Sequence, residues 1–208
     1  MSVATTESSE VQVFIETDKP YGRTYGAWTA RWWKWIYSIP SEINPLSDLT
    51  GENWKTDQPS SDVWFLVGIF GDVQKTFPLR RIEMESGRSI LFPVLNCEAN
   101  KLEFPEMSDD DLVKHVVNDV NTVVKKECTV NGKRLRPVLI ASDPKIFSLR
   151  IPKNNALGAK NMGLTDATAY GYWIFLKSLP KGKYNICFEG SCEFGRLNSG
   201  ADYQVNVV

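Results

Sequence analysis

Apolar and polar residues alternate with a period of two through much of the chain. The segment VQVFIE (11–16) follows this pattern, which is typical of a strand with one face on a core. Two segments, VWFLVGIF (63–70) and SILFPVL (89–95), are apolar throughout, so strands buried on both faces are expected there. Further strands are expected at 77–84, 127–130, 134–141, 146–151, 171–177, 183–189 and 202–208. Short strands separated by turns such as Asn131-Gly132 predict a mainly β fold, a jelly-roll-like antiparallel β-sandwich.

Residues 109–126 have helical periodicity instead. Ser108 is the expected N-cap, and Asp111 three residues later completes a capping box. The apolar face is expected to consist of Leu112, Val116, Val120 and Val123 or Val124. Lys125 and Lys126 then close the last turn, where positive charge stabilises the helix dipole.

A second helix is expected over residues 24–39, between an N-cap at Thr24 and a stop at Pro40. It lies within YGRTYGAWTARWWKWIYSIP (21–40), which holds four of the seven tryptophans and three of the seven tyrosines. Helical spacing puts Trp28, Trp32 and Trp35 on one face. Core packing is the favoured interpretation of this face, and contact with a second copy or partner, small-ligand binding and membrane contact are the alternatives.

The aromatic face is wider than one sheet face readily covers, because Trp33 and Tyr37 flank the tryptophan stripe. We therefore expect a homo-oligomer, or contact with another protein, that uses Trp33 or Tyr37. The C-terminal segment DYQVNVV (202–208) has no proline or lysine to protect a sheet edge and is the second candidate for pairing.

Two long polar loops are expected at 44–66 and 154–173. If the fold has a cleft, these loops and the edge of the aromatic helix are expected to line it. The candidate ligand- or partner-binding residues are therefore Trp28, Arg31, Trp32, Trp33, Trp35, Tyr37, Trp54, Tyr170 and Tyr172.

The length of 208 residues suits one domain, expected over residues 10–208 after a disordered lead-in at 1–9. The formal net charge of -1 provides no field for nucleic acid, and the basic run around Asn131-Gly132 is interpreted as a solvated hairpin. No signal-peptide pattern or membrane-spanning apolar run is visible, which predicts a soluble, cytoplasmic protein.

Several chemistries lack the residues they need. His115 is the one histidine, and there is no G-x-S-x-G, Walker A or G-x-G-x-x-G motif, so no catalytic residue and no cofactor are assigned. The four cysteines are interpreted as reduced thiols, with a disulfide between Cys187 and Cys192 across a hairpin turn as the alternative. No metal site is expected, because the acids at 109–111 suit helix capping better than calcium binding.

Carboxylate chemistry remains the alternative to a binding role. The acids near the middle of the chain are Glu83, Glu85, Glu98, Glu103 and Glu106. Two of them converging in a concave pocket would favour a hydrolase-like enzyme, possibly one that acts on a carbohydrate. A flat aromatic surface without such a pair would favour binding.

The spacing Y-G-x-T-Y-x-x-W-x-x-R-W-W-x-W from Tyr21 to Trp35, followed by VWFLVG, GRSILFPVLN and YGYWIFLKSLPKGKY, resembles an uncharacterised family of prokaryotic proteins. The resemblance covers residues 20–190 approximately and implies that these segments belong to one architecture. It brings no activity and no catalytic residue with it. The sequence therefore favours a non-catalytic binding or self-assembly module, with the carboxylate hydrolase as the alternative.

Overall fold

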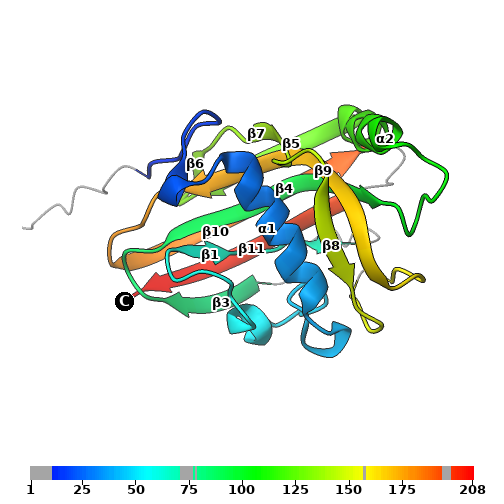
Figure 1. The fold of residues 1–208 in the computed structure, drawn as a ribbon. Helices are drawn as coiled ribbons and strands as arrows, with labels where there is room; N and C mark the ends of the chain where they lie inside the picture. The colour runs from blue at the N-terminus through cyan, green and yellow to red at the C-terminus, as the bar shows by residue number, and fades with distance from the viewer. Residues whose placement is uncertain (1–10, 71–76, 78, 157, 194–197) are drawn as a thin grey trace, which may run out of the picture.

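Two β-sheets form the body of the protein (Figure 1). The computed structural model describes residues 11–70, 77, 79–156, 158–193 and 198–208. The first sheet contains β1 (Val63–Phe65), β4 (Ser89–Asn100), β9 (Gly163–Leu176), β7 (Val138–Ala141) and β8 (Phe147–Ile151). The second sheet contains β2 (Ile69–Phe70), β3 (Leu79–Met84), β11 (Asn198–Val207), β10 (Gly182–Cys192), β5 (Val123–Val130) and β6 (Lys133–Arg134).

The predicted mainly β sandwich with two helices is confirmed. Both sheets are mixed, because β1 runs parallel to β4 and β3 runs parallel to β11 while the other pairs are antiparallel. The jelly-roll connectivity stays a prediction. The predicted lead-in at 1–9 lies outside the described residues.

The first sheet lies between two cores. One of its faces packs on the second sheet through residues such as Phe92 and Phe188, and its other face packs on the helix α1 (Tyr25–Ser38) through residues such as Phe175. In Figure 1, α1 runs diagonally across this outer face. Both faces of β4 are therefore buried, as its continuously apolar sequence predicts. The strand β3 alternates exposed and buried residues, because the outer face of the second sheet is open to water.

The helix α1 has the predicted ends. The Thr24 hydroxyl accepts a hydrogen bond from the Ala27 amide at 3.1 Å, and the helix stops before Pro40. The side-chain amide of Asn44 donates to the carbonyls of Ile36 and Ile39, which satisfies the open end of the helix.

The second helix, α2 (Asp109–Asn121), is shorter than predicted. Its capping box is confirmed, since Ser108 accepts from the Asp111 amide at 3.2 Å. The prediction that the helix continues to residue 126 is wrong, because 123–130 forms β5 and pairs with β10. Two adjacent β-branched valines at 123–124 favour a strand, and the tertiary pairing decides the outcome.

Three other expectations are wrong. Residues 11–16 form a single bridge, Val13 to Leu176, and no strand. The loop expected at 154–173 becomes strand from Gly163 onward. The C-terminal strand β11 is not an edge, because β10 pairs with one side of it and β2 and β3 pair with the other.

The four cysteines are free, and the proposed disulfide alternative is wrong. Cys187 and Cys192 lie on one continuous strand, β10, rather than on the two arms of a hairpin. Five strand residues span about 16 Å, whereas the Cα atoms of a disulfide lie about 4.4–6.8 Å apart.

Candidate functional site

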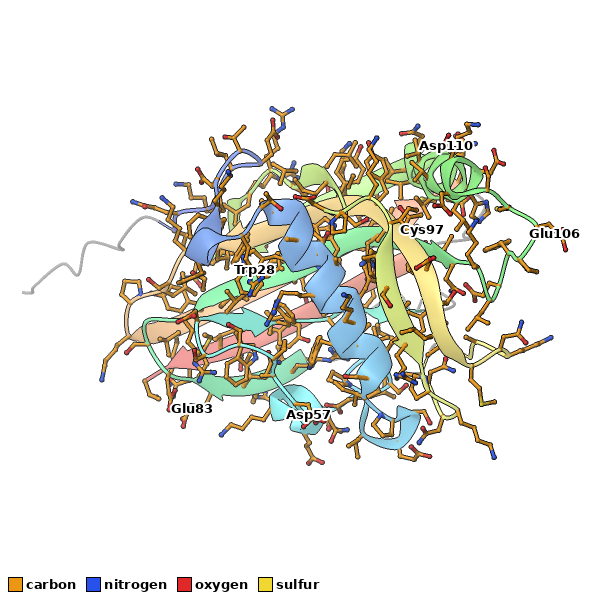
Figure 2. All side chains as sticks on the ribbon, viewed as in Figure 1. Trp28, Asp57, Glu83, Cys97, Glu106 and Asp110 are labelled. Atoms are coloured by element: carbon orange, nitrogen blue, oxygen red, sulfur yellow. The ribbon has the colours of Figure 1, made fainter. Side chains whose placement is uncertain are left out.

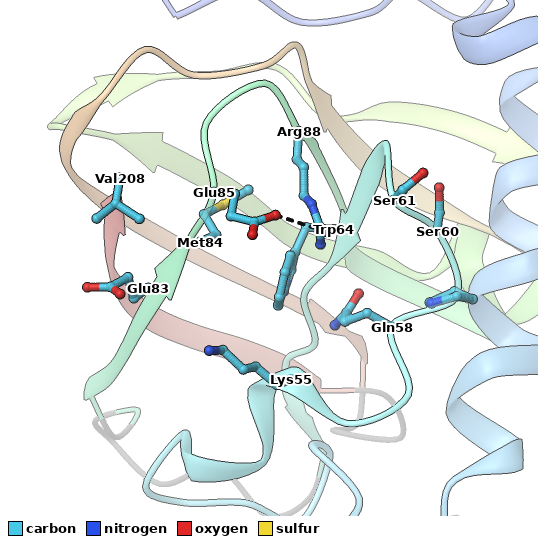
Figure 3. Close-up of a pocket in the computed structure, with 11 residues that line it drawn as sticks. Lys55, Gln58, Ser60, Ser61, Trp64, Glu83, Met84, Glu85, Arg88 and Val208 are labelled. Carbon is cyan, nitrogen blue, oxygen red and sulfur yellow. Dashed lines mark ion pairs between the residues drawn. The ribbon is translucent and has the colours of Figure 1, made fainter.

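A pocket of about 680 Å³ opens at one side of the sandwich, where β1 at the edge of the first sheet faces β3 of the second sheet (Figure 3). We call it the β1–β3 pocket. It is lined by Lys55, Gln58, Pro59, Ser60, Ser61, Trp64, Glu83, Met84, Glu85, Arg88 and Val208. Most of these side chains are polar, and they surround one tryptophan.

Trp64 projects from β1 into the core between the sheets and is only 5% exposed. The Arg88 guanidinium lies over its ring, 5.0 Å from the ring centre, and pairs with the Glu85 carboxylate at 3.3 Å. In Figure 3 the three side chains lie together at the centre of the pocket. A cation held over an aromatic face and paired with an acid keeps a fixed orientation.

A short crossover places Glu85 and Arg88 in the pocket. The chain leaves the second sheet at Met84 and enters the first sheet at Ser89, so only four residues connect the two layers. Gly87 has φ of +90°, a conformation that side-chain-bearing residues rarely adopt, and this allows the tight turn.

The loop between α1 and β1 supplies the opposite wall. The Gln58 amide pairs with the Phe65 backbone, donating to the carbonyl at 3.0 Å and accepting from the N–H at 2.8 Å. This bidentate contact fixes residues 58–61 beside β1 and places Ser60 and Ser61 at the rim. Gln58 therefore shapes the wall with its side-chain amide.

Asp48 organises the turn that leads to Lys55. Its carboxylate accepts hydrogen bonds from the amides of Thr50, Gly51 and Asn53, and these bonds lower the pKa of Asp48 despite the opposing effect of its burial. The 3-10 helix η3 (Glu52–Lys55) follows directly and carries Lys55 to the pocket. The segment NPLSDLTGENW (44–54) thus forms an ordered turn that supports Lys55 without lining the pocket itself.

The charged side chains at the pocket have both signs. Lys55 and Arg88 are positive, and Glu85 is negative. Glu83 lines the pocket from β3, but its side chain points to the exposed outer face of the second sheet, where it accepts a hydrogen bond from the Asn206 side chain at 3.1 Å. The pocket therefore presents both donors and acceptors of hydrogen bonds.

The five acids named from the sequence do not form one group. Figure 2 shows Glu83 and Glu106 at opposite ends of the molecule. Glu83 and Glu85 share the β1–β3 pocket. The Glu85 side chain is 78% exposed, so it lacks the shelter from water that a general acid uses to keep its proton.

A second pair of acids, Glu98 and Glu103, lies at the end of β4. Glu98 accepts a hydrogen bond from the Tyr37 hydroxyl at 2.8 Å, and its Oε1 atom is buried. Burial, together with the negative charge of Glu103, raises the pKa of Glu98 to about 8. Glu103 accepts from the Asn100 side chain at 2.8 Å. Tyr37 covers the Glu98 carboxylate from the helix side, whereas Glu103 is exposed, so the two acids differ in their access to water.

The aromatic residues of α1 lie inside the protein. The exposed fractions are Trp28 2%, Trp32 0%, Trp33 3%, Trp35 3% and Tyr37 3%. Three of the indole N–H groups donate to backbone carbonyls, those of Pro20, Leu66 and Thr56. These rings pack on each other and on the first sheet, so the favoured interpretation as core packing is confirmed.

The other candidate residues lie in different places. Arg31 stacks on Trp28 with 5.3 Å between its guanidinium carbon and the ring centre, and it donates to the Pro59 carbonyl. Tyr170 packs against the cluster beneath α2, and Tyr172 lies at the opposite side of the sandwich from the β1–β3 pocket. The side chain of Trp54 lies outside the described residues.

Sequence reasoning found one wall of the pocket and missed its centre. The loop at 44–66 lines the pocket as expected, whereas α1 and the segment 154–173 do not. Arg88 was missed because its ring partner, Trp64, comes from β1, which no local pattern places beside the turn that follows β3. The motif GRSILFPVLN that contains it was the available signal.

The described part of the chain has neither a cluster of metal ligands nor a helix that could span a membrane. No group of three or more His, Cys, Asp or Glu side chains in the described part of the chain has the arrangement of a metal site. No helix within the described ranges is long and apolar enough to cross a membrane.

The comparisons with known proteins give no relative. No protein-family model matches the chain, and neither a curated protein nor a solved structure is significantly similar to it. The function is therefore inferred from the geometry of the β1–β3 pocket.

Proposed function

We propose that the protein is a non-catalytic binding module and that the β1–β3 pocket takes a neutral, hydroxyl-rich ligand of the carbohydrate class. The observation that carries this proposal is the combination of charged donors and a charged acceptor, Lys55, Arg88 and Glu85, around Trp64. Carboxylates, a guanidinium and an ammonium hydrogen-bond well to vicinal hydroxyl groups, and the charged partner strengthens each bond. A ligand with a net charge would meet an unfavourable partner on one side of the pocket.

A ligand is expected to contact the side chains around the tryptophan rather than the face of its ring. Trp64 is too deeply buried to offer its ring face as a platform for a sugar, since Arg88 covers it. Recognition therefore depends on hydrogen bonds from the side chains that surround the ring. The hydrogen bonds of Gln58 and Asp48 hold the backbone that carries Lys55, Ser60 and Ser61, which reduces the entropy lost by this wall on binding.

The hydrolase remains the alternative, because Glu83 and Glu85 line the same pocket. The ion pair between Glu85 and Arg88 and the exposure of Glu85 favour a binding role for these acids. A cytoplasmic location is also part of the proposal, and the four free thiols support it because reducing compartments keep thiols reduced. Self-assembly through Trp33 or Tyr37 has no such support, since both rings are covered within the chain.

A panel of neutral oligosaccharides tests the proposal. Saturation-transfer NMR on the full chain identifies a binder, and calorimetry compares the wild type with Arg88→Ala. We expect the variant to bind about tenfold or more weakly, which corresponds to about 1.4 kcal/mol for a lost charge-assisted hydrogen bond. Arg150→Ala, an exposed arginine on β8, is the matched control and should bind like the wild type.

Two outcomes would contradict the proposal. One is the absence of a signal from every neutral oligosaccharide at millimolar concentration with folded protein. The other is the appearance of shorter oligosaccharides, detected by mass spectrometry, whose formation is abolished in Glu83→Gln or Glu85→Gln. That second result would establish the hydrolase.

A further inference from the structure

A second pocket opens at the other side of the sandwich, lined by residues of β5 and β6 in the second sheet and of β7 in the first sheet. Figure 1 shows these three strands at one side of the molecule. We call it the β5–β7 pocket, and its volume is about 730 Å³. The two pockets are therefore at the two open sides between the same pair of sheets. No residue lines both.

The backbone explains why the sheets separate here. The Asn131-Gly132 turn leads into β6, which pairs with β5 over only two residues. The Leu135 amide still donates to the Cys128 carbonyl at 2.9 Å, and the chain then crosses to the first sheet at Val138. Pro137 lies in the crossover and cannot donate a backbone hydrogen bond, so it ends the pairing.

Apolar side chains form the inner wall of this pocket. Leu135 and Tyr172 pack against the core between the sheets, and Pro137 is buried beside them. Val138 and Leu139 complete this side. A ligand in the pocket therefore meets a wall that favours an apolar body.

Basic side chains form the rim. The Lys126 ammonium lies over the Tyr172 ring, 4.0 Å from its centre. Arg134 and Arg136 also line the pocket, against two acids, Glu16 and Glu127. The lining therefore carries three positive and two negative formal charges.

The acids of the rim do not form ion pairs with two of its three cations. Within the described ranges, neither Lys126 nor Arg136 has a carboxylate within ion-pair distance. Glu127 contacts Lys125 and Arg134, each at 3.9 Å. Lys125 points to the other face of β5, where it pairs with Glu189.

We propose that the β5–β7 pocket binds a small organic anion, a carboxylate or phosphate on a flat apolar body. The anionic group lies between Lys126 and Arg136, and the apolar body lies against Leu135, Pro137 and Tyr172. A guanidinium and an ammonium both donate to an anionic oxygen, and the guanidinium can do so through two parallel bonds. The pocket is too small for a nucleic-acid strand to enter, and three cations give only a short electrostatic footprint.

Two fluorinated probes of the same shape test the charge requirement. Fluorine NMR on the full chain compares 4-fluorobenzoate, which is anionic, with 4-fluorobenzamide, which is neutral. We expect the benzoate to bind about tenfold more tightly, with an affinity that falls as salt is added. Inorganic phosphate and 4-fluorophenyl phosphate distinguish the two head groups and show whether the apolar body contributes.

Variants locate the site. Arg136→Ala and Lys126→Ala should each weaken benzoate binding about fivefold to tenfold, while Arg150→Ala should leave it unchanged. Tyr172→Leu should weaken both the benzoate and the organic phosphate, because it removes the aromatic wall. Circular dichroism of each variant confirms that it is folded, and binding to the β1–β3 pocket serves as an independent control.

Three results would overturn the inference. Equal binding of the benzoate and the benzamide would show that the anion is not recognised. Unchanged affinity in Arg136→Ala and Lys126→Ala would move the anion elsewhere. Tighter binding of a single-stranded oligonucleotide than of either organic anion would replace the small ligand with nucleic acid.

Discussion

Arg80 shows how one residue positions the loop that builds the β1–β3 pocket. It is 2% exposed, and its guanidinium donates to the carbonyls of Val67, Pro45 and Asp48 and to the Tyr203 hydroxyl. These four dipoles take the place of a carboxylate partner. The arginine therefore joins the loop that follows α1 to the second sheet.

Replacing Arg80 tests this role. Arg80→Met keeps most of the volume but leaves buried carbonyls without donors, so we expect a loss on the order of 2 to 4 kcal/mol in the free energy of unfolding. Arg81→Met, on the exposed face of the same strand, should change it by less than about 0.5 kcal/mol. Urea unfolding monitored by fluorescence measures both. Similar losses in the two variants would contradict the buried role of Arg80.

Glu98 predicts a dependence of stability on pH. Its pKa is about 8 in the folded protein, against an ordinary value of 4.5, because burial disfavours the charged carboxylate. Between these two values the folded state holds a proton that the unfolded state has lost. The stabilisation is therefore complete below pH 4.5 and decreases as the pH rises toward 8, and it is absent above that value.

The variant Glu98→Gln isolates this effect, because glutamine keeps an acceptor for the Tyr37 hydroxyl and cannot ionise. Between pH 5 and pH 8.5, the wild type should lose on the order of 3 to 4 kcal/mol more than the variant in the free energy of unfolding. Tyr37, Glu103 and Cys97 remain in both proteins, so the difference between the two profiles is due to the Glu98 carboxylate and its coupling to these neighbours. Glu106→Gln, at an exposed site, should behave like the wild type. Identical pH profiles for Glu98→Gln and the wild type would contradict the assignment.

At the scale of elements, α1 is the cover of the first sheet. Trp32 lies at its centre, fully buried, with ring contacts to Trp33, Trp35 and Trp173 and an indole N–H that donates to the Leu66 carbonyl at 3.0 Å. The helix therefore depends on tertiary packing as well as on its caps.

Trp32→Ala should lower the free energy of unfolding by about 3 to 5 kcal/mol, because a large aromatic side chain leaves a cavity. Lys34→Ala, on the exposed side of the same helix, should change it by less than about 0.5 kcal/mol. Denaturant unfolding of the two variants gives the comparison. A loss below 1 kcal/mol for Trp32→Ala would show that the aromatic face is not part of the core.

Local signals predicted the elements that depend on local contacts. Thr24 and Pro40 define α1, and Ser108 starts α2, because caps and stops act within a few residues. The predicted C-terminal end of α2 was wrong, because residues 123 and 124 belong to β5, and the pairing of β5 with β10 makes them strand rather than helix. A short window of sequence contains the caps and stops of a helix, but it does not contain the distant strand with which a segment pairs.

At the scale of the whole molecule, the sequence pattern did not predict which sheet each strand joins or which strands are its neighbours. The crossover from β3 to β4 brings Arg88 onto Trp64, and the crossover from β6 to β7 opens the second pocket. Both crossovers connect different sheets. Alternation along a strand predicts which residues are buried but says nothing about which sheet contains the next strand.

The strand β11 gives the sharpest test of the topology. It lies between β10 on one side and β2 and β3 on the other, and Tyr203, Val205 and Val207 are buried in the core between the sheets. A deletion of residues 202–208 therefore removes a central strand and leaves β3 without its partner. We expect the shortened protein to lose its near-UV circular dichroism and its cooperative unfolding transition. The double variant Gln204→Ala and Asn206→Ala changes the other face of the same strand and should remain folded. A folded, cooperatively unfolding deletion variant would place β11 at an edge, where it could pair with a second copy, and would restore the C-terminal strand as an assembly surface.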